Sequence, residues 1–552
     1  MPQITVNRKV FETLVGKKLP LDKLKDRISM LGTDLDEVTD TEIKVEIFPD
    51  RPDMLSEQGF ARAFSAFIGV KKGLRHYTVK DSGMQVIIDK SLKNIRPYTA
   101  CAIVRNMKFD DEKIREVIQI QEKLHVSYGR NRKRVAIGIY PLEKITPPIY
   151  FTAKDPSKVK FRPLEYPDEI TGLQILSKHP TGREYAHLLD GAKKFPFFID
   201  AAGKILSMPP IINSHDVGKI TEQTTDVFIE CSGFDYDVLA KCLNFIVTAF
   251  ADMGGEIYSM ELVYDDKKII SPNLQPFEMP LDLGYVNKIL GLQLNEAEVK
   301  DCLERMGFSY DNGKVLVPAW RADILHMIDL VEDIAIAYGY ENFDEIIPNV
   351  ATIGQIDKFN DFTEKILNVL VGAGLIETNT YCIINKDEQT KLMNLDYSVI
   401  ELQSSVSEEY NSLRFWMIPS LLKVLRDNRQ HEYPQCIYEA GRVFMKDTKN
   451  VTETGVSEAV RLAVALCAHD ADYTKIRQIL DIIFEALALS YEVKETEHPS
   501  FIAGRVARVY VKDKAVAYIG ELHPKVLSNY ELLNPVAALE LNLTDLFEVY
   551  NS

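Results

Sequence analysis

The chain has 552 residues, which is too long for one hydrophobic core, so we expect about three to five domains. Its hydrophobic content of 46% and charged content of 26% are ordinary for a globular protein, and without an apolar run of about 18 residues we expect no membrane span. The net charge of −16 argues against a chain that grips nucleic acid mainly by its own surface, because phosphates repel an acidic protein. A partner could supply most of such a contact.

The cysteines and the N-terminus indicate the compartment. The seven cysteines are odd in number, widely scattered and without a CxxC pair, so the sequence predicts neither a disulfide framework nor a zinc site. The first nine residues contain no apolar signal core, so we do not expect secretion. A cytoplasmic protein fits both observations.

Residues 1–85 are predicted to form a small α/β module. Apolar residues at helical spacing precede Gly32, which is typical of a helix that ends in a glycine. Residues 41–48 alternate as a strand does, residues 49–52 form a proline-rich turn, and residues 55–70 are predicted to form a second helix.

Residues 86–268 are rich in predicted strands. Residues 97–104 and 135–140 are apolar enough for buried strands, and residues 110–128 between them show helical periodicity. Two further predicted strands end in polar residues, which we expect to form a cleft with acceptors and hydroxyls: Asn213, Ser214, Glu230 and Ser232. The alternative is that these residues only cap turns and expose one glutamate.

A basic run lies inside the same region. It consists of Arg130, Arg132, Lys133 and Arg134. Such a run is usually a solvated loop, and the alternative is a contact with nucleic acid.

Residues 269–346 combine a capped helix with an acidic motif. Residues 295–307 have the pattern of a capping box followed by a glycine stop, and residues 314–317 are predicted to form a short strand. The acidic motif consists of Asp323, Asp329, Glu332 and Asp333.

Helical spacing from Ile324 onward places the last three of these carboxylates on one helix face, with Asp323 as the N-cap. A Mg²⁺ ion or a basic partner surface would relieve their repulsion. The alternative is a solvated acidic face.

Residues 347–552 are predicted to form another α/β domain. Residues 359–373 are expected to be an amphipathic helix, and residues 377–384 and 437–444 are expected to be strands. The histidines of this part, His498 and His523, each stand beside a proline and are interpreted as structural.

Several phrases resemble the beta-subunit family of phenylalanyl-tRNA synthetases in its archaeal or eukaryotic form. They include Pro318-Ala-Trp-Arg-Ala-Asp-Ile, Asp329-Leu-Val-Glu-Asp-Ile-Ala and Tyr338-Gly-Tyr. Residues 46–62, 182–189 and 224–233 carry further matches. The resemblance spans the chain in order.

The resemblance implies an α+β multidomain fold in four parts. These are a small α/β N-terminal module (1–85), a mixed editing domain (86–268), a helix-rich winged-helix-like module (269–346) and a class II synthetase-like antiparallel domain (347–552). The last part contains no GxGxGxxR sequence, so we expect no residue of this chain to catalyse aminoacylation.

The resemblance also implies partners and cofactors. We expect an alpha subunit in a two-alpha, two-beta heterotetramer, tRNA-Phe, and ATP used through the alpha subunit. The four acidic positions Asp323, Asp329, Glu332 and Asp333 are expected to bind Mg²⁺ in a site shared with that subunit.

Finally, the resemblance implies hydrolysis of tRNA-Phe that carries tyrosine. An apolar phenylalanine pocket rejects an isostere with an added hydroxyl only by a factor on the order of 10², so a second site is needed. Glu230, Ser232 or Ser214 would receive the phenol, with Leu206 against the ring and a positioned water as the attacking group. The family commonly has Asp-x-Thr where this chain has Glu230-Cys-Ser232, which leaves open a purely architectural subunit with a decayed editing site. A stand-alone tRNA deacylase is disfavoured, because the large catalytic-like domain serves only as an interface.

Overall fold

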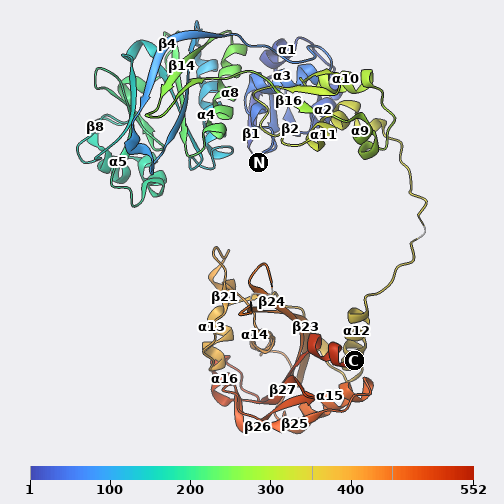
Figure 1. Ribbon diagram of the computed structural model, residues 1–552. Helices are drawn as coiled ribbons and strands as arrows, with labels where there is room; N and C mark the ends of the chain where they lie inside the picture. Colours follow the sequence, from blue (N-terminus) through green and yellow to red (C-terminus); the bar gives the residue numbers. More distant parts are fainter. Residues whose placement is uncertain (1, 351, 450–451, 552) are drawn as a thin grey trace. The chain divides into compact units, whose positions relative to one another are not determined.

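The computed structural model describes residues 2–350, 352–449 and 452–551, and it divides the chain into two compact units. The first is Met1–Ile347 and the second is Pro348–Ser552. Both units mix helices with sheets (Figure 1). Among the described residues, no helix is both long and apolar enough to cross a membrane.

The first unit begins with a three-stranded antiparallel sheet in the order β1-β3-β2, flanked by helices. These elements are β1 (Gln3–Asn7), β2 (Asp34–Val38), β3 (Glu42–Glu46), α1 (Arg8–Val15), α2 (Leu21–Met30) and α3 (Glu57–Phe67). The predicted helix before Gly32, the predicted strand over 41–48 and the predicted helix over 55–70 are confirmed as α2, β3 and α3. The helix α3 begins at a capping serine, because the Ser56 hydroxyl accepts the Gly59 N–H at 2.9 Å.

A large mixed sheet follows in the order β12-β11-β10-β7-β4-β14-β5-β13-β6, with β15 beside β14. Its strands are β4 (Val79–Ile88), β5 (Tyr98–Arg105), β6 (Val135–Pro141), β7 (Ile149–Lys154), β10 (Phe195–Ile199), β11 (Ile205–Met208), β12 (Ile212–Asn213), β13 (Val227–Gly233), β14 (Glu256–Val263) and β15 (Lys268–Ser271). The helices α4 (Asp111–Val126) and α8 (Tyr236–Asp252) pack on one side (Figure 1). A second core covers the other side, so the strands β5, β6 and β13 are buried on both faces. This burial explains their continuous apolar runs, and the predicted elements over 97–104, 110–128 and 135–140 are confirmed.

The two end strands of this sheet, β12 and β6, are joined by side chains. The Tyr140 hydroxyl of β6 lies 3.3 Å from Asn213 Oδ1 of β12. A small extension with its own core stands beside β10 and β11. It contains β8 (Lys160–Phe161), β9 (Ile170–Thr171), α5 (Gly172–Lys178) and α6 (Pro180–Tyr185), and α7 (His215–Gly218) follows β12.

The remainder of the first unit carries the acidic motif. It consists of β16 (Phe277–Pro280), β17 (Ser309–Asp311), β18 (Lys314–Val317), α9 (Leu283–Leu290), α10 (Glu296–Arg305) and α11 (Met327–Tyr338). The predicted capping box of α10 is confirmed, with Asn295 and Glu298 bonded to each other's backbone.

The predicted start of the acidic helix is wrong. The helix α11 begins at Met327 rather than near Ile324, and its N-cap is His326 rather than Asp323. The reason is that Arg321 holds the Asp323 carboxylate, while the Asp329 carboxylate bonds back to the His326 N–H at 2.7 Å.

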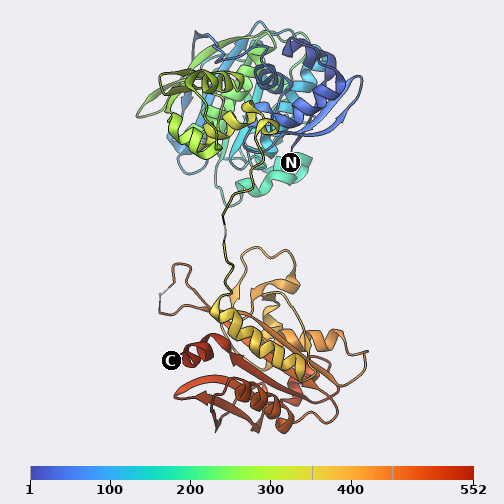
Figure 2. The ribbon, with the colours of Figure 1, turned by 90° about the vertical axis from the view of Figure 1, so that its right-hand side faces the viewer.

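The second unit contains a seven-stranded sheet in the order β19-β23-β24-β28-β27-β26-β25, antiparallel except for the β19–β23 pair. Its strands are β19 (Ile376–Glu377), β23 (Gln435–Lys446), β24 (Val456–Cys467), β25 (Glu492–Glu495), β26 (Phe501–Val511), β27 (Lys514–Leu522) and β28 (Val536–Asn542). The helices α12 (Lys358–Gly372), α15 (Tyr473–Ala486) and α17 (Leu543–Tyr550) pack on one face, and α14 (Ile418–Asp427) packs on the other. Figure 2 shows α12 lying across this unit.

A smaller sheet in this unit has the order β20-β22-β21, with β20 (Ile383–Ile384), β21 (Ile400–Glu401) and β22 (Ser412–Leu413). The short helices α13 (Lys386–Gln389) and α16 (Pro524–Asn529) complete the unit. The predicted helix over 359–373 and the predicted strand over 437–444 are confirmed. The predicted strand over 377–384 is wrong, because the chain divides it between β19 and β20, which belong to different sheets.

The two units have separate cores, so we expect them to unfold separately. Ile519 of β27 is fully buried in the core beneath α12 and α15. The Ile519→Ala variant should lose about 2–5 kcal/mol, because it leaves a cavity in a closely packed core. Differential scanning calorimetry of the chain should show one transition moved to lower temperature and the other unchanged. An equal shift of all transitions would contradict separate cores.

Candidate functional site

The candidate site is a cavity of about 470 Å³ in the first unit. Its apolar wall comes from α4, β6 and the Pro209–Pro210 turn, and its polar end is formed by Ser207, Asn213 and Glu230. The cavity therefore combines a surface suited to a ring with convergent polar groups, as ligand sites commonly do. Its lining also includes Gln121, His125, Arg132 and His215.

The carboxyl group of Glu230 dominates the polar end. Only 2% of Glu230 is exposed, and its Oε1 accepts the Tyr140 hydroxyl at 3.2 Å. The other oxygen, Oε2, is buried and accepts no hydrogen bond from any described residue. Burial raises the pKa of Glu230 to about 8, although the charge of Arg96 and the hydroxyls of Tyr140 and Ser232 lower it. The carboxyl is therefore mainly protonated at neutral pH and can donate as well as accept a hydrogen bond.

Ser207 and Tyr140 belong to this site and were not predicted from the sequence. Ser207 is 1% exposed and lines the cavity, and its hydroxyl makes no hydrogen bond within the described residues. Tyr140 is fully buried and bonds both Glu230 and Asn213. Alternation along β11 could have found Ser207, because neighbours on a strand face opposite sides.

A glycine makes room for this arrangement. Gly138 lies opposite Glu230 in the β6–β13 register. A Cβ at position 138 would lie 2.0 Å from the Tyr140 hydroxyl oxygen and 2.6 Å from Glu230 Oε1. A side chain at this position would therefore break the contact between Tyr140 and Glu230.

Of the five residues predicted for the editing pocket, Asn213 and Glu230 line the cavity, and Leu206, Ser214 and Ser232 do not. Leu206 is fully buried in the sheet core, so it does not face a ring in the cavity. Ser214 is 3% exposed and donates its backbone N–H to the Leu206 carbonyl at 2.8 Å. The Ser232 hydroxyl accepts Arg96 Nε at 3.1 Å.

The basic run divides into two half-buried and two exposed members. Arg132 Nη1 donates to the Ile211 carbonyl at 2.8 Å, and its guanidinium lies 4.4 Å from the centre of the Tyr185 ring. Arg134 lies 5.1 Å from the centre of the Tyr128 ring. Arg130 and Lys133 are exposed, and they are the two members of the run still available for contact with nucleic acid.

The turn before β6 has an unusual backbone. Arg130, Asn131 and Arg132 all have positive φ, of 49°, 52° and 63°. Consecutive left-handed residues other than glycine are unfavourable and concentrate near functional sites. Here the turn places Arg132 at the cavity, where it also bonds Glu122 at 3.2 Å.

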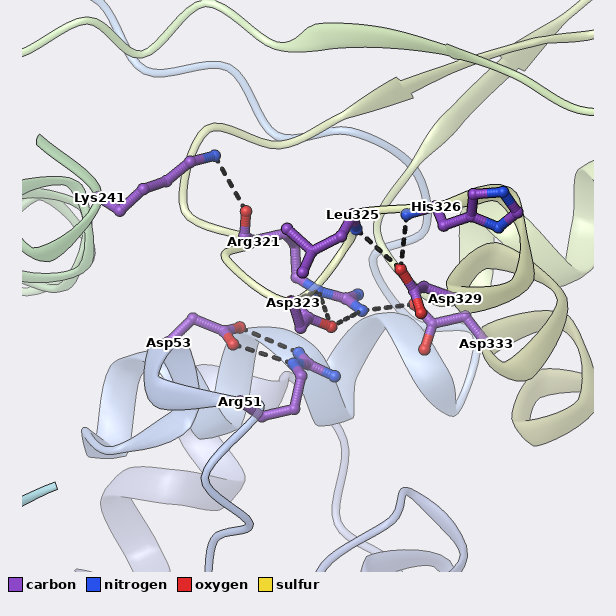
Figure 3. Close-up of polar contacts among 9 residues, drawn as sticks. All are labelled: Arg51, Asp53, Lys241, Arg321, Asp323, Leu325, His326, Asp329 and Asp333. Carbon is purple, nitrogen blue, oxygen red and sulfur yellow. Dashed lines mark hydrogen bonds and ion pairs between the residues drawn. The ribbon is translucent and has the colours of Figure 1, made fainter. Parts of the chain in front are cut away.

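The four acidic residues of the motif have different partners. Figure 3 shows those of Asp323, Asp329 and Asp333. Arg321 Nη2 lies 2.6 Å from both Asp323 Oδ2 and Asp333 Oδ2. Asp329 accepts the N–H groups of Leu325 and His326 at 2.8 and 2.7 Å, and Glu332 accepts the Tyr340 hydroxyl at 2.8 Å.

These contacts decide whether the motif fits a metal ion. Across residues 2–350, 352–449 and 452–551, no three His, Cys, Asp or Glu side chains come together as a metal site. Asp323 and Asp333 face a guanidinium, so within this chain the four residues do not fit as one ligand set. Asp329 is partly exposed and Glu332 is exposed, so these two remain accessible to a hydrated cation.

In the second unit, the buried Arg414 binds residues of its own chain. Arg414 Nη1 lies 2.8 Å from Glu439 Oε1 and 2.9 Å from the Thr380 hydroxyl, and Arg414 is 2% exposed. A Cβ at Gly441 would lie 2.2 Å from Arg414 Nη2. The guanidinium is thus fixed by neighbours of its own chain.

The raised pKa of Glu230 predicts a pH dependence of stability. The carboxyl has an ordinary pKa near 4.5 when unfolded and about 8 when folded. Because the folded state binds this proton more tightly, its stabilisation is complete below about pH 4.5 and is lost as the pH rises through about 8. The free energy of unfolding of the wild type, minus that of Glu230→Gln, should therefore fall between about pH 5 and pH 8.

Urea unfolding of both proteins across this range measures the difference. Burial also raises the pKa of Glu57 to about 8. Because Glu57 is present in both proteins, its titration cancels in the difference. A difference that is independent of pH would mean that Glu230 titrates normally.

Known proteins match this chain along its whole length. The family described as "Phenylalanyl tRNA synthetase beta chain CLM domain" matches residues 344–543, and "tRNA synthetase B5 domain" matches residues 279–340. The phenylalanine–tRNA ligase beta subunit of Pyrococcus abyssi is 40% identical over 99% of this chain and 100% of its own length. The corresponding protein of Archaeoglobus fulgidus is 36% identical over 99% of both chains.

A solved structure supports the fold of the first unit. The N-terminal fragment of the phenylalanyl-tRNA synthetase beta subunit from Pyrococcus horikoshii is 40% identical, with a TM-score of 0.59, over 61% of this chain and 99% of the fragment. Identity at this level over nearly full length leaves one conclusion: the chain belongs to the phenylalanine–tRNA ligase beta-subunit family.

Proposed function

We propose that the chain works with an alpha subunit in a heterotetramer of two alpha and two beta subunits that attaches phenylalanine to tRNA-Phe in the cytoplasm. The alpha subunit uses ATP and performs the aminoacylation. The chain then has four parts. The N-terminal module is residues 1–85 and the editing domain is residues 86–268. The winged-helix-like module is residues 269–346 and the class II synthetase-like domain is residues 347–552.

The editing domain hydrolyses tyrosyl-tRNA-Phe in the cavity at Glu230. The observation that carries this proposal is the unpartnered, buried Glu230 Oε2 in a cavity that has an apolar wall. A phenol hydroxyl supplies the missing partner, while the ring lies against the isoleucines of α4 and β6. A phenylalanyl group would leave Glu230 Oε2 and the Ser207 hydroxyl unpaired, which costs about 1–3 kcal/mol for each group.

Hydrolysis needs only a positioned water. The water oxygen bonds to the ester carbonyl carbon, the bond to the ribose oxygen breaks, and a proton of the water passes to that oxygen. The products are tyrosine and uncharged tRNA-Phe. Glu230 positions the substrate in this scheme. Arg130 and Lys133, which stand close to the cavity residue Arg132 in the sequence, are exposed to meet phosphates.

The acidic motif binds Mg²⁺ through a smaller set than the four predicted residues. Asp329 and Glu332 are three residues apart on α11 and accessible, so they hold a hydrated ion, with further ligands from the alpha subunit. The ion would supply positive charge where the two subunits meet.

The test is release of tyrosine from tyrosyl-tRNA-Phe by the complex with the alpha subunit. Glu230→Ala should slow release by about 100-fold or more, because the site loses its partner for the phenol. Charging with phenylalanine should stay unchanged.

Two serines give a matched pair for the same assay. Ser207→Ala should slow release by about 10-fold, since Ser207 lines the cavity, whereas Ser214→Ala should not, since Ser214 does not. No release by the wild-type complex, with charging intact, would favour the purely architectural subunit.

A further inference from the structure

We propose that the Arg321 guanidinium is the resident cation of the acidic motif, and that Asp323 and Asp333 are its structural counter-ions rather than ligands of a metal ion. The motif then has two functions. Its inner half, Asp323 and Asp333, stabilises the fold through ion pairs with Arg321. Its outer half, Asp329 and Glu332, remains accessible to a hydrated cation.

The geometry supports the inner half directly. Arg321 Nη2 lies 2.6 Å from one oxygen of each aspartate, and Arg321 Nε lies 2.9 Å from Asp323 Oδ1 (Figure 3). The three side chains are only 2%, 12% and 7% exposed for Arg321, Asp323 and Asp333. The guanidinium therefore occupies the place between the two carboxylates where a metal ion would have to sit.

Neighbouring charges balance the group formed by Arg321, Asp323 and Asp333 without any metal ion. Arg51 donates from Nε and Nη2 to the two carboxylate oxygens of Asp53, each at 2.9 Å. Both side chains lie beside Arg321 and its two aspartates (Figure 3). Lys241 of α8 donates to the Arg321 carbonyl at 3.0 Å. Arg321 and Arg51 thus pair with Asp323, Asp333 and Asp53, and the charge of Lys241 lies near enough to interact with that of Asp323.

A divalent ion added among these groups would leave two uncompensated positive charges. Since buried charges without partners are strongly unfavourable, it would have to expel the guanidinium. The face of the Phe308 ring, 4.9 Å from Arg321 Cζ, gives the cation a further favourable contact.

The ion pairs also explain the shape of the loop before α11. Asp323 and Asp333 are ten positions apart, and one guanidinium ties both to the start of the loop. With the loop fixed, Asp329 can bond the Leu325 and His326 N–H groups, and the Leu325 side chain stays 82% exposed. The accessible carboxylates of α11 are thereby held at the surface.

The experiment measures Mn²⁺ binding by electron paramagnetic resonance, as a probe for Mg²⁺, in the complex with the alpha subunit. Arg321→Met removes the cation and leaves both carboxylates, so this variant should gain a Mn²⁺ site that the wild type lacks. The double variant Arg321→Met with Asp323→Asn should lose the added site. In the wild-type background, Asp323→Asn should leave Mn²⁺ affinity unchanged, whereas Asp329→Asn should weaken it by about 10-fold or more.

Thermal unfolding gives a second readout that does not depend on the ion. Asp323→Asn should lower the unfolding midpoint of the first unit by roughly 5 °C or more, with or without MgCl₂, because a buried ion pair loses one partner. Lys314→Met, which breaks the exposed pair with Glu278 in the same module, should leave the midpoint nearly unchanged.

Two results would overturn the proposal. One is a loss of Mn²⁺ affinity in Asp323→Asn equal to that in Asp329→Asn. The other is a midpoint shift that appears only when MgCl₂ is present. Either would identify Asp323 as a metal ligand. If Arg321→Met does not fold, the aspartate variants decide the question alone.

Discussion

The first unit depends on how it keeps buried guanidinium groups paired. An arginine removed from water is unfavourable unless carboxylates and polar groups surround it. Arg321 meets this need with Asp323 and Asp333, and Arg62 of α3 meets it with Asp252 of α8, at 2.8 Å. Arg62 also lies 4.8 Å from the centre of the Trp320 ring. These contacts connect the N-terminal module, the large sheet domain and the acidic-motif module.

The cavity depends on a related feature, because the Glu230 carboxyl is buried and one of its oxygens has no hydrogen-bond partner among the described residues. Glu230 is held on a strand buried on both faces, and Gly138 leaves the space in which Tyr140 reaches it. The bond from Tyr140 to Asn213 also joins the two end strands of the sheet. The polar end of the cavity is therefore fixed by strands rather than by a mobile loop, which suits a site that must distinguish a hydroxyl from a hydrogen.

The sequence predicted those parts in which local pattern and tertiary environment agree. The periodicity of α4 and the capping box of α10 are visible in the residues themselves. The start of α11 was not, because Asp323 is taken by a guanidinium two residues away. The role of Ser207 depends on which side of β11 faces the cavity, and that of Tyr140 depends on pairing between strands far apart in sequence. Side-chain direction and long-range pairing were therefore the missing information.

In the proposed function, the cavity recognises the phenol of tyrosine through Glu230. The most direct measurement is calorimetric binding of a non-hydrolysable 3′-tyrosylamino adenosine and its phenylalanyl counterpart to the complex with the alpha subunit. We expect the tyrosyl compound to bind at least about 10-fold more tightly, and a crystal structure to place its hydroxyl at Glu230 Oε2. Equal affinities, or a tyrosyl group bound outside this cavity, would contradict it.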